Sequence, residues 1–256
     1  MGEALIGGLL DAGYEAESIA VAEVDPDRRR ELEERCKGVR VVPSAAWAVA
    51  DTEIVVVAVK PQDVAAVLEQ AASSLAEDAL VISIAAGVKI AAIEAAVPGR
   101  PVVRAMPNTP ALVRKAATAI AGGKHATPGH LETAERVLGA VGAVVQVPEA
   151  HLDAVTGLSG SGPAYLFLVA ESLIEAGVLA GLPRQTADAL VRQMLLGSAQ
   201  LLASGDESPE ALRAAVTSPG GTTAAGLHSL EQRGVRAAFL DAVRAATERS
   251  RQLGDQ

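Results

Sequence analysis

The segment Val216–Glu231 (VTSPGGTTAAGLHSLE) has the residue types and spacing best suited to binding chemistry. Ser218-Pro219 begins a turn, and Gly220-Gly221 let the backbone approach a ligand because neither residue carries a Cβ. Thr222-Thr223 then open a helix, whose first-turn amides and dipole together favour a small anion. A threonine hydroxyl beside them can hydrogen-bond a nitrogen of the same ligand. A Gly-Gly turn with a threonine N-cap and no ligand is the alternative interpretation.

A second set of candidate residues lies at the start of the chain and could bind a dinucleotide. Gly2, followed by Glu3–Leu10, is typical of the last glycine of a phosphate-binding turn and the helix after it. Glu23 follows 21 residues later, where an acid binds a ribose 2′-hydroxyl. The strand and earlier glycines of such a turn do not precede Gly2, so we expect a Rossmann unit without its first strand. A glycine near the start and an exposed glutamate are the alternative interpretation.

Three loops that follow predicted strands add small residues suited to cofactor contact. The first is Ala58–Gln62 (AVKPQ), where a proline turns the chain out of the sheet, and the second is Ala85–Gly87 (AAG). The third, Met106–Pro110 (MPNTP), holds an asparagine that offers both a donor and an acceptor. The candidate cofactor-binding residues in these loops are Ala58, Val59, Lys60, Pro61, Ala85, Ala86, Met106, Pro107 and Asn108. Ordinary turns, with an Asx-turn at Asn108, are the alternative interpretation.

These loops require a sheet whose strands end at a common edge, and residues 1–150 have the alternation that builds one. The predicted strands are Ile19–Val24, Arg40–Val42, Glu53–Val59, Ala79–Ile84, Pro101–Ala105, Ala117–Ala121 and Ala143–Val147. The predicted helices between them are Asp27–Lys37, Ser44–Ala50, Asp63–Leu75, Lys89–Ala96 and Pro128–Leu138. This alternation predicts an α/β, Rossmann-like domain with a doubly wound parallel sheet.

The second part of the chain, residues 151–256, is predicted to be all helical, with the boundary near Pro148–His151. The predicted helices are Ala164–Ala180, Arg184–Ser204, Glu210–Val216, Thr223–Gln232 and Val235–Gln252. The stretch Pro163–Ala180 is apolar around most of its circumference, and such a helix needs cover on several sides. We expect a second copy of the chain to supply that cover. A central core helix in a monomer is the alternative.

The composition narrows the classes of protein and partner. The chain has 256 residues, of which 50% are hydrophobic and 21% charged, which predicts a globular protein rather than a disordered one. A net charge of −9 argues against a nucleic-acid partner, and acids surround the run Arg28–Arg30. We expect no membrane contact, because we find no signal peptide and no apolar run of the ~18–20 residues that cross a bilayer.

Cysteine and histidine usage points to a metal-free protein in a reducing cytoplasm. Cys36 is the single cysteine, so no internal disulfide can form. The four histidines have no close i, i+4 pairing, and we expect no metal site. Ser159 and Ser161 lie in a glycine-rich segment, but no His–Asp pattern supports a serine nucleophile.

The chain resembles the pyrroline-5-carboxylate reductase family in five segments that occur in the family's order: MGEALIGGL, AVKPQ, RAMPNTP, GLSGSGPAY and TSPGGTTAAGLHSLE. The resemblance covers essentially the whole chain, and its last segment is the most specific. It implies a Rossmann domain followed by an all-helical dimerisation domain, in a homodimer that can assemble into decamers. It implies reduction of (S)-1-pyrroline-5-carboxylate to L-proline by NADPH or NADH, the last step of proline biosynthesis.

The resemblance also implies roles for individual residues. The backbone of Gly220–Thr222, with Ser218 beside it, would hold the substrate carboxylate, and Thr223 would act as the catalytic residue by hydrogen-bonding the imine nitrogen. Asn108 would contact the nicotinamide half of the cofactor, and Ala58, Lys60 and Pro61 the adenosine half. The substrate pocket would lie at the dimer interface.

Two departures from the family keep alternatives open. The missing first strand and glycines favour an inactive or nucleotide-sensing paralogue as the alternative function. Many NADPH-preferring relatives carry an arginine after the second strand, but this chain has Glu23-Val24-Asp25, which suits the 2′-hydroxyl of NADH. Arg28 is the side chain that could still bind a 2′-phosphate. A dehydrogenase of another small substrate is less consistent, because residues 151–256 contain no lysine to serve as acid or base.

Overall fold

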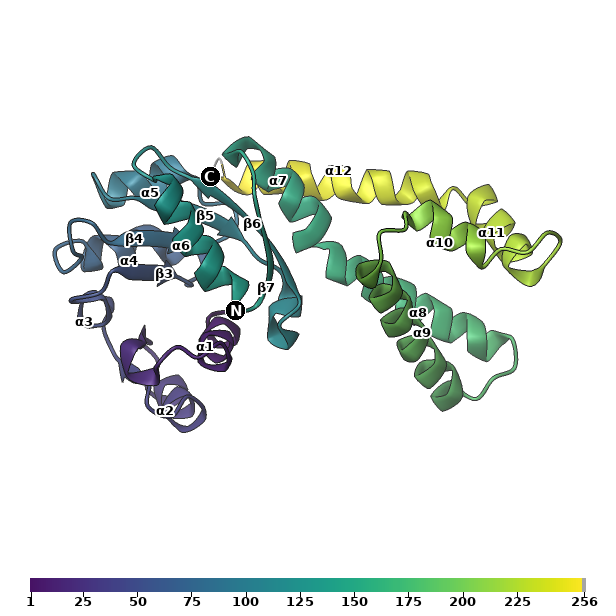
Figure 1. Cartoon of the computed structure of the whole chain (residues 1–256), viewed down its shortest axis with the longest axis horizontal. Coiled ribbons are helices and arrows are strands. Elements are labelled where there is room, and N and C mark those ends of the chain that lie inside the picture. The colour runs from purple at the N-terminus through teal and green to yellow at the C-terminus, as the bar shows by residue number, and fades with distance from the viewer. Residues whose placement is uncertain (255–256) are drawn as a thin grey trace. The chain divides into compact units, whose positions relative to one another are not determined.

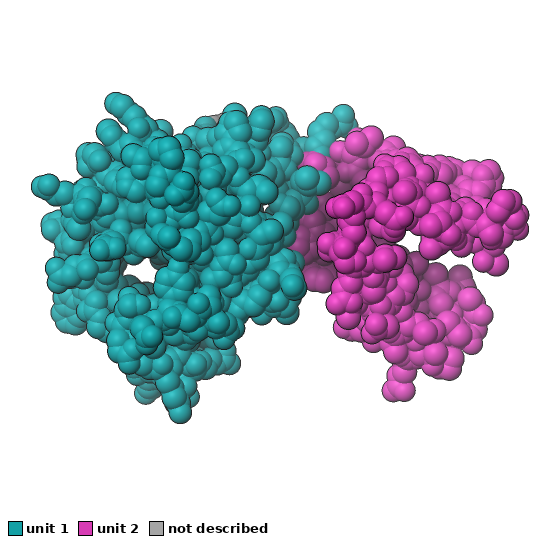
Figure 2. All heavy atoms as spheres, in the orientation of Figure 1, with its two compact units in different colours: residues 1–161, 244–256 teal, residues 162–243 magenta. Residues whose placement is uncertain are grey.

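The computed structural model describes residues 1–254 and divides the chain into two compact units (Figure 2). The first unit comprises Met1–Ser161 with Arg244–Gln256, and the second comprises Gly162–Val243. The long helix α12 (Val235–Gly254) begins in the second unit and ends in the first. The domain division at residue 150 stays a prediction.

The first unit alternates strands and helices as the sequence predicts (Figure 1). Its strands are β1 Ala20–Ala22, β2 Arg40–Val42, β3 Ile54–Val57, β4 Leu80–Ser83, β5 Val102–Met106, β6 Ala116–Gly122 and β7 Gly142–Gln146. Its helices are α1 Gly2–Asp11, α2 Pro26–Arg35, α3 Ala45–Val49, α4 Val64–Ala71, α5 Ile90–Ala96, α6 Pro128–Gly139 and α7 Leu152–Val155. Every predicted strand is confirmed, with small differences at its ends.

The strands form two separate sheets. β1 and β2 pair in parallel, and the larger sheet has the order β3-β4-β5-β6-β7. Within it β5 and β6 run antiparallel, with Val103 opposite Gly122, so the prediction of an all-parallel sheet is wrong at this position. The reason is the connection, because β5 is joined to β6 by a short segment containing the 3₁₀ turn Thr109–Val113. A parallel crossover needs a dozen residues or more.

Helices cover both faces of the larger sheet. On one face, α1 and α6 contribute Leu5 and Leu138 to the core. On the other face, α4, α5 and α7 contribute Leu68, Ile93 and Leu152. Because both faces are covered, the central strands can be apolar throughout, which explains the nearly continuous hydrophobic runs in their sequences.

The small sheet has its own core and an unpaired edge. Ile6 of α1 packs with Leu32 and Cys36 of α2 and with Val39. β1 pairs only with β2, and β3 pairs only with β4. The described residues contain no strand ahead of α1, which begins at Gly2.

The second unit is helical throughout, which confirms the prediction for this part of the chain. It contains α8 Gly162–Leu179, α9 Arg184–Ser204, α10 Pro209–Ala215, α11 Thr222–Gln232 and the first part of α12. α8 and α9 pack against each other. Gly177 allows their close approach, because a Cβ there would lie 3.1 Å from the Cβ of Ala187, which is 1% exposed.

The apolar surface of α8 is not covered within the chain. None of its residues is buried, and Leu166, Phe167 and Leu168 are about 60% exposed. The continuous helical stretch Glu149–Leu179 is, by length and composition alone, long and apolar enough to cross a membrane. The expectation that no such stretch exists is therefore wrong, because α8 alone has 18 residues and only two of them, Glu171 and Glu175, are charged.

Candidate functional site

Three of the predicted cofactor loops lie on one edge of the first unit. β3, β4 and β5 run parallel, so their carboxyl ends meet at that edge. The residues that follow these strands are Ala58, Val59, Lys60 and Pro61 after β3, Ala85 and Ala86 after β4, and Pro107 and Asn108 after β5, with Met106 as the last residue of β5. The fold therefore brings the loops together as the sequence predicts.

The N-terminus of α1 joins this edge. A Cβ on Gly2 would lie 3.4 Å from the Cβ of Ala58, so the helix begins directly beside the end of β3. The cap of α1 at Met1 has no side-chain hydrogen bond, and the first-turn amides have no acceptor within the helix. Small neighbours and free amides at a helix start fit the phosphates of a dinucleotide.

The loop after β4 is held by the end of α12, which belongs to the same unit. Gly87 has a φ of +80°, which favours glycine, and a Cβ there would lie 3.6 Å from Leu253. Gly254 approaches so closely that a Cβ on it would lie 2.7 Å from the Gly87 carbonyl oxygen. Nearby, the Ser250 hydroxyl donates a hydrogen bond of 2.7 Å to Asp153. Sequence reasoning missed this contact, because residues distant in the sequence make it.

Asn108 has a structural role at the end of β5. Its Nδ2 donates to the carbonyl of Ser159 at 3.0 Å, and its Oδ1 accepts from the amide of Ala117 at 2.9 Å. The side chain is therefore not part of an Asx-turn, and it is 9% exposed. Gly160, the residue after Ser159, lies close to Met106 of β5, because a Cβ on Gly160 would lie 2.7 Å from the Met106 Cε. The glycine-rich segment thus packs on the β5 loop.

Glu23 lies directly after β1, as expected for a residue that contacts ribose. Its Oε1 accepts a hydrogen bond of 3.0 Å from the amide of Asp25. The Asp25 carboxylate caps α2 by accepting from the amides of Asp27 and Arg28, and these hydrogen bonds lower the pKa of Asp25. The end of β1 therefore carries two carboxylates on an ordered turn.

The Gly-Gly-Thr-Thr segment of the second unit forms a tight turn into α11. Gly220 has a φ of +68°, and the Gly221 amide donates to the Ser218 carbonyl at 3.0 Å. A Cβ on Gly221 would lie 2.3 Å from the Ser218 hydroxyl oxygen, so that hydroxyl would have to move to admit any other residue. Gly221 caps α11 without a side-chain hydrogen bond, so the cap is not a threonine, and the first-turn amides have no acceptor within the helix.

Two other features of the described residues bear on the chemistry. No three His, Cys, Asp or Glu residues in the range 1–254 gather closely enough to hold a metal ion. An open hollow of about 410 Å³ lies on the second unit, lined in part by Arg213, Thr217 and Glu231, but none of the predicted substrate residues lines it.

An ion pair between the buried Arg104 and the half-buried Glu149, which the sequence did not reveal, supports the sheet edge. Arg104 of β5 is 5% exposed, and its Nη1 lies 3.2 Å from Oε1 of Glu149. The same carboxylate oxygen accepts from the amide of Ile90 at the start of α5. An arginine inside an apolar strand is the signal that could have predicted a buried acidic partner.

Comparison with known proteins relates this geometry to a family. Residues 149–253 match the model described as pyrroline-5-carboxylate reductase dimerisation, and residues 1–87 match the NADP oxidoreductase, coenzyme F420-dependent, model. The pyrroline-5-carboxylate reductase of Methanosarcina acetivorans is 45% identical over 99% of this chain and 94% of that protein. This chain belongs to the pyrroline-5-carboxylate reductase family.

Solved structures of pyrroline-5-carboxylate reductases agree with this assignment. The enzyme from Coxiella burnetii superimposes with a TM-score of 0.93 at 36% identity, covering 98% of this chain and 94% of that one. The Plasmodium falciparum enzyme, solved with NADP bound, gives a TM-score of 0.86 at 31% identity, covering 99% and 94%. These relatives give no support to the alternative of an inactive paralogue.

Proposed function

We propose that this chain is an NAD(P)H-dependent pyrroline-5-carboxylate reductase that converts (S)-1-pyrroline-5-carboxylate to L-proline. The observation that carries the proposal is the match of nearly the whole chain to reductases of that name. The Gly-Gly-Thr-Thr turn supports it further, because it forms a helix start without a side-chain cap. An uncapped helix start suits a small carboxylate, and a cyclic imino acid has one.

In this proposal the turn before α11 holds the substrate. The amides of Gly220, Gly221 and Thr222, beside Ser218, bind the carboxylate, since a helix start attracts an anion. Thr223 is the catalytic residue, because its hydroxyl hydrogen-bonds the ring nitrogen. The positive φ of Gly220 and the close packing of Gly221 against Ser218 define the conformation of this turn.

The edge of the first unit would hold the cofactor. Gly2 and the start of α1 face the phosphates, and Glu23 accepts from a ribose hydroxyl. The remaining proposed contacts are Ala58, Val59, Lys60, Pro61, Ala85, Ala86, Met106, Pro107 and Asn108. The hydrogen bonds of Asn108 to Ser159 and Ala117 orient the loop, and one N–H of its amide is left for a carboxamide.

In this reaction the main task of the protein is to orient the substrate relative to the cofactor. Bound reduced nicotinamide supplies a hydride to the C=N carbon, the nitrogen carries a proton, and L-proline and the oxidised cofactor are formed. Because a protonated imine is already electrophilic, the chain needs to fix the carboxylate and the ring nitrogen. Thr223 and the amides before it provide those contacts.

A turnover assay tests the proposal directly. The purified full-length chain is mixed with pyrroline-5-carboxylate and NADH or NADPH, and loss of reduced cofactor is followed by absorbance while proline is quantified by amino-acid analysis. We expect one proline for each cofactor oxidised. A 2-oxo acid, such as pyruvate, serves as the control substrate and should not be reduced.

The nucleotide-sensing alternative predicts a different result. A folded protein that binds NADH in a calorimetric titration but forms no proline supports that alternative. A folded protein that binds neither cofactor contradicts both functions.

We also propose that the chain works as a cytoplasmic homodimer that can build larger assemblies such as decamers, without nucleic-acid or membrane partners. The match of residues 149–253 to the dimerisation model and the uncovered apolar residues of α8 support the dimer. The single buried Cys36 suits a reducing compartment.

A further inference from the structure

The three arginines at the start of α2 lie where a doubly wound fold distinguishes NADH from NADPH. They follow β1 and Glu23, and the ribose 2′ position of the cofactor is read at the end of this strand. A free guanidinium there would bind the 2′-phosphate of NADPH. The hydrogen bonds of these arginines therefore bear on which cofactor the proposed reductase prefers.

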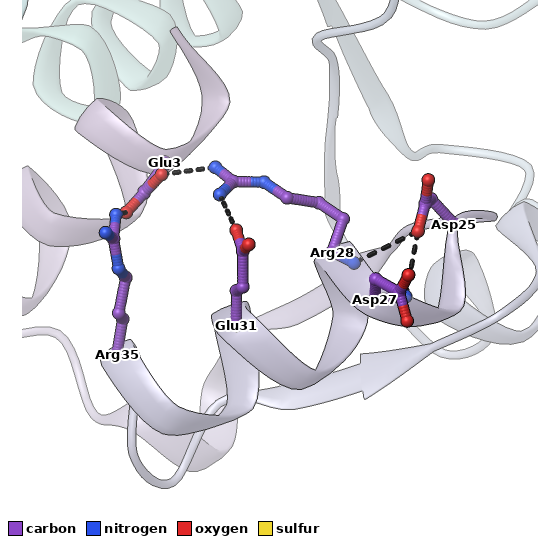
Figure 3. Close-up of polar contacts among 6 residues, drawn as sticks. All are labelled: Glu3, Asp25, Asp27, Arg28, Glu31 and Arg35. Carbon is purple, nitrogen blue, oxygen red and sulfur yellow. Dashed lines mark hydrogen bonds and ion pairs between the residues drawn. The ribbon is translucent and has the colours of Figure 1, made fainter.

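Arg28 is held between two acids. Its Nη2 pairs with Oε2 of Glu3 from α1, and its Nη1 lies 2.6 Å from Oε2 of Glu31 (Figure 3). Figure 3 shows the side chain extending toward Glu3 and away from the carboxylate of Asp25. The Arg28 guanidinium is therefore paired with carboxylates of α1 and α2 instead of with the turn after β1.

Glu3 is the centre of this network. Its other oxygen, Oε1, lies 2.8 Å from Nη1 of Arg35, so one carboxylate holds two arginines of α2. Hydrogen bonds from Arg35 and Arg28 lower the pKa of Glu3, which keeps the carboxylate ionised near neutral pH. Two thirds of the Glu3 side chain is shielded from solvent, compared with less than half for Glu31.

The neighbouring arginines also have partners. Nη1 of Arg29 donates to the carbonyls of Glu23 and Val24, at 2.9 Å each, and so braces the turn. Arg30 pairs with Asp27 on the outer face of α2. The turn after β1 therefore presents carboxylates, while every guanidinium of the run has an acceptor within the unit.

We propose that Glu3 is a cofactor-specificity residue that, by holding Arg28, strengthens the enzyme's preference for NADH over NADPH. The carboxylates at the end of β1 accept from a 2′-hydroxyl but repel a 2′-phosphate, which carries nearly two negative charges. Removing the Glu3 charge takes away one of the two acids that hold Arg28, so that Arg28 can turn more readily toward that phosphate. The inference rests on the proposed function for the identity of the cofactor.

The test measures direct binding as well as turnover. Dissociation constants of NADH and NADPH are determined from the fluorescence of the reduced nicotinamide, for the full-length wild type and for Glu3→Gln. We expect the wild type to bind NADH at least about tenfold more tightly. Because an exposed ion pair is weak, we expect Glu3→Gln to tighten NADPH binding, relative to NADH binding, roughly two- to fivefold.

Matched variants separate the specificity role from general damage. Arg35→Gln removes the second partner of Glu3 without releasing Arg28, so the ratio of the two dissociation constants should stay that of the wild type. The double variant Glu3→Gln/Arg28→Gln should lose the gain in NADPH binding. Thermal melting checks that each variant is folded.

Several outcomes would overturn the inference. One is a wild type that binds NADPH more tightly than NADH, and another is a folded Glu3→Gln variant with an unchanged ratio. If Glu3→Gln does not fold, the variant Arg28→Gln provides the test. It should leave NADPH binding unchanged. A loss of NADPH affinity of more than fivefold would show that Arg28 already contacts the phosphate and would overturn the inference. Preferential NADH binding without proline formation would defeat the proposed function but leave this inference standing.

Discussion

Thr223 is the side chain whose removal should affect substrate handling without affecting the cofactor. It lies in the first turn of α11, and the proposal gives its hydroxyl one hydrogen bond to the ring nitrogen. We expect Thr223→Ala to lower kcat/KM for pyrroline-5-carboxylate by roughly 10–1000-fold, about 1.4–4 kcal/mol of transition-state binding. Thr223→Ser, which keeps the hydroxyl, should retain most of the activity. Steady-state kinetics with both variants make the comparison, and an unchanged Thr223→Ala enzyme would remove this residue from the mechanism.

Asn108 should affect stability more than Thr223 does. Its side chain is nearly buried, and both of its polar ends bond to backbone groups. Asn108→Ala leaves the Ser159 carbonyl and the Ala117 amide without these partners, which should cost about 1–3 kcal/mol of unfolding free energy. Urea denaturation measures this loss. A variant of full stability with a raised KM for the cofactor would show instead that Asn108 acts mainly through cofactor contact.

The turn before Thr223 and the side chain of Asn108 show how much of a single position can be predicted from sequence. The turn at Gly220 is local, so its glycines and the following helix predict its shape without further information. The partner of Asn108 is Ser159, 51 residues away, and nothing in the sequence near either residue indicates the contact. Long-range partners depend on which loops the sheet brings together.

The positions of the strands could be predicted from the sequence, but the direction of each strand could not. The apolar runs of β3, β4 and β5 identify buried strands, because covered strands need hydrophobic residues on both faces. The same pattern fits either direction, and β6 turned out antiparallel to β5. The short connection through Thr109–Val113 was the signal, since it leaves too little chain for a crossover.

The unpaired edges of β1 and β3 give a prediction at this scale. The backbone amide of Arg40 donates to the Ile19 carbonyl, and the backbone amide of Leu80 donates to the Glu53 carbonyl. The next residue along β1 or β3 directs its own N–H and C=O away from the partner strand, and this alternation continues along each strand. These outward residues are Ala20 and Ala22 in β1, and Ile54 and Val56 in β3. Figure 2 shows an opening through this unit near β3, where an added strand could pair.

An extended apolar segment of about five residues with a glycine turn, fused ahead of Met1, should therefore stabilise the first unit. Pairing with even one edge adds several backbone hydrogen bonds, and roughly 2–3 kcal/mol would raise Tm by about 5–10 °C. Differential scanning calorimetry measures the shift. The control fusion has proline at alternate positions, which cannot donate to the strand edges. Equal Tm values for the two fusions would contradict strand pairing.

For the whole molecule, the decisive feature is the apolar surface of α8. Leu166, Phe167 and Leu168 are exposed, and they lie in the region that matches the dimerisation model. Since three consecutive helical positions point in different directions, one flat partner surface cannot cover them all. This arrangement favours a second chain whose helices interlock with α8 over a simple side-by-side contact.

Phe167→Glu tests this conclusion. Burying an unpaired carboxylate between two chains is costly, and a central aromatic residue at an interface contributes about 2 kcal/mol or more, so the variant should weaken association at least roughly thirtyfold. Light scattering coupled to size-exclusion chromatography should show the wild type as a dimer or larger and the variant shifted toward monomer. Gln70→Glu adds the same charge on the exposed face of α4, outside the dimerisation region, and should leave the assembly unchanged. If the variant keeps the wild-type mass across dilution, Phe167 is not at the interface, and another surface must cover the apolar helix.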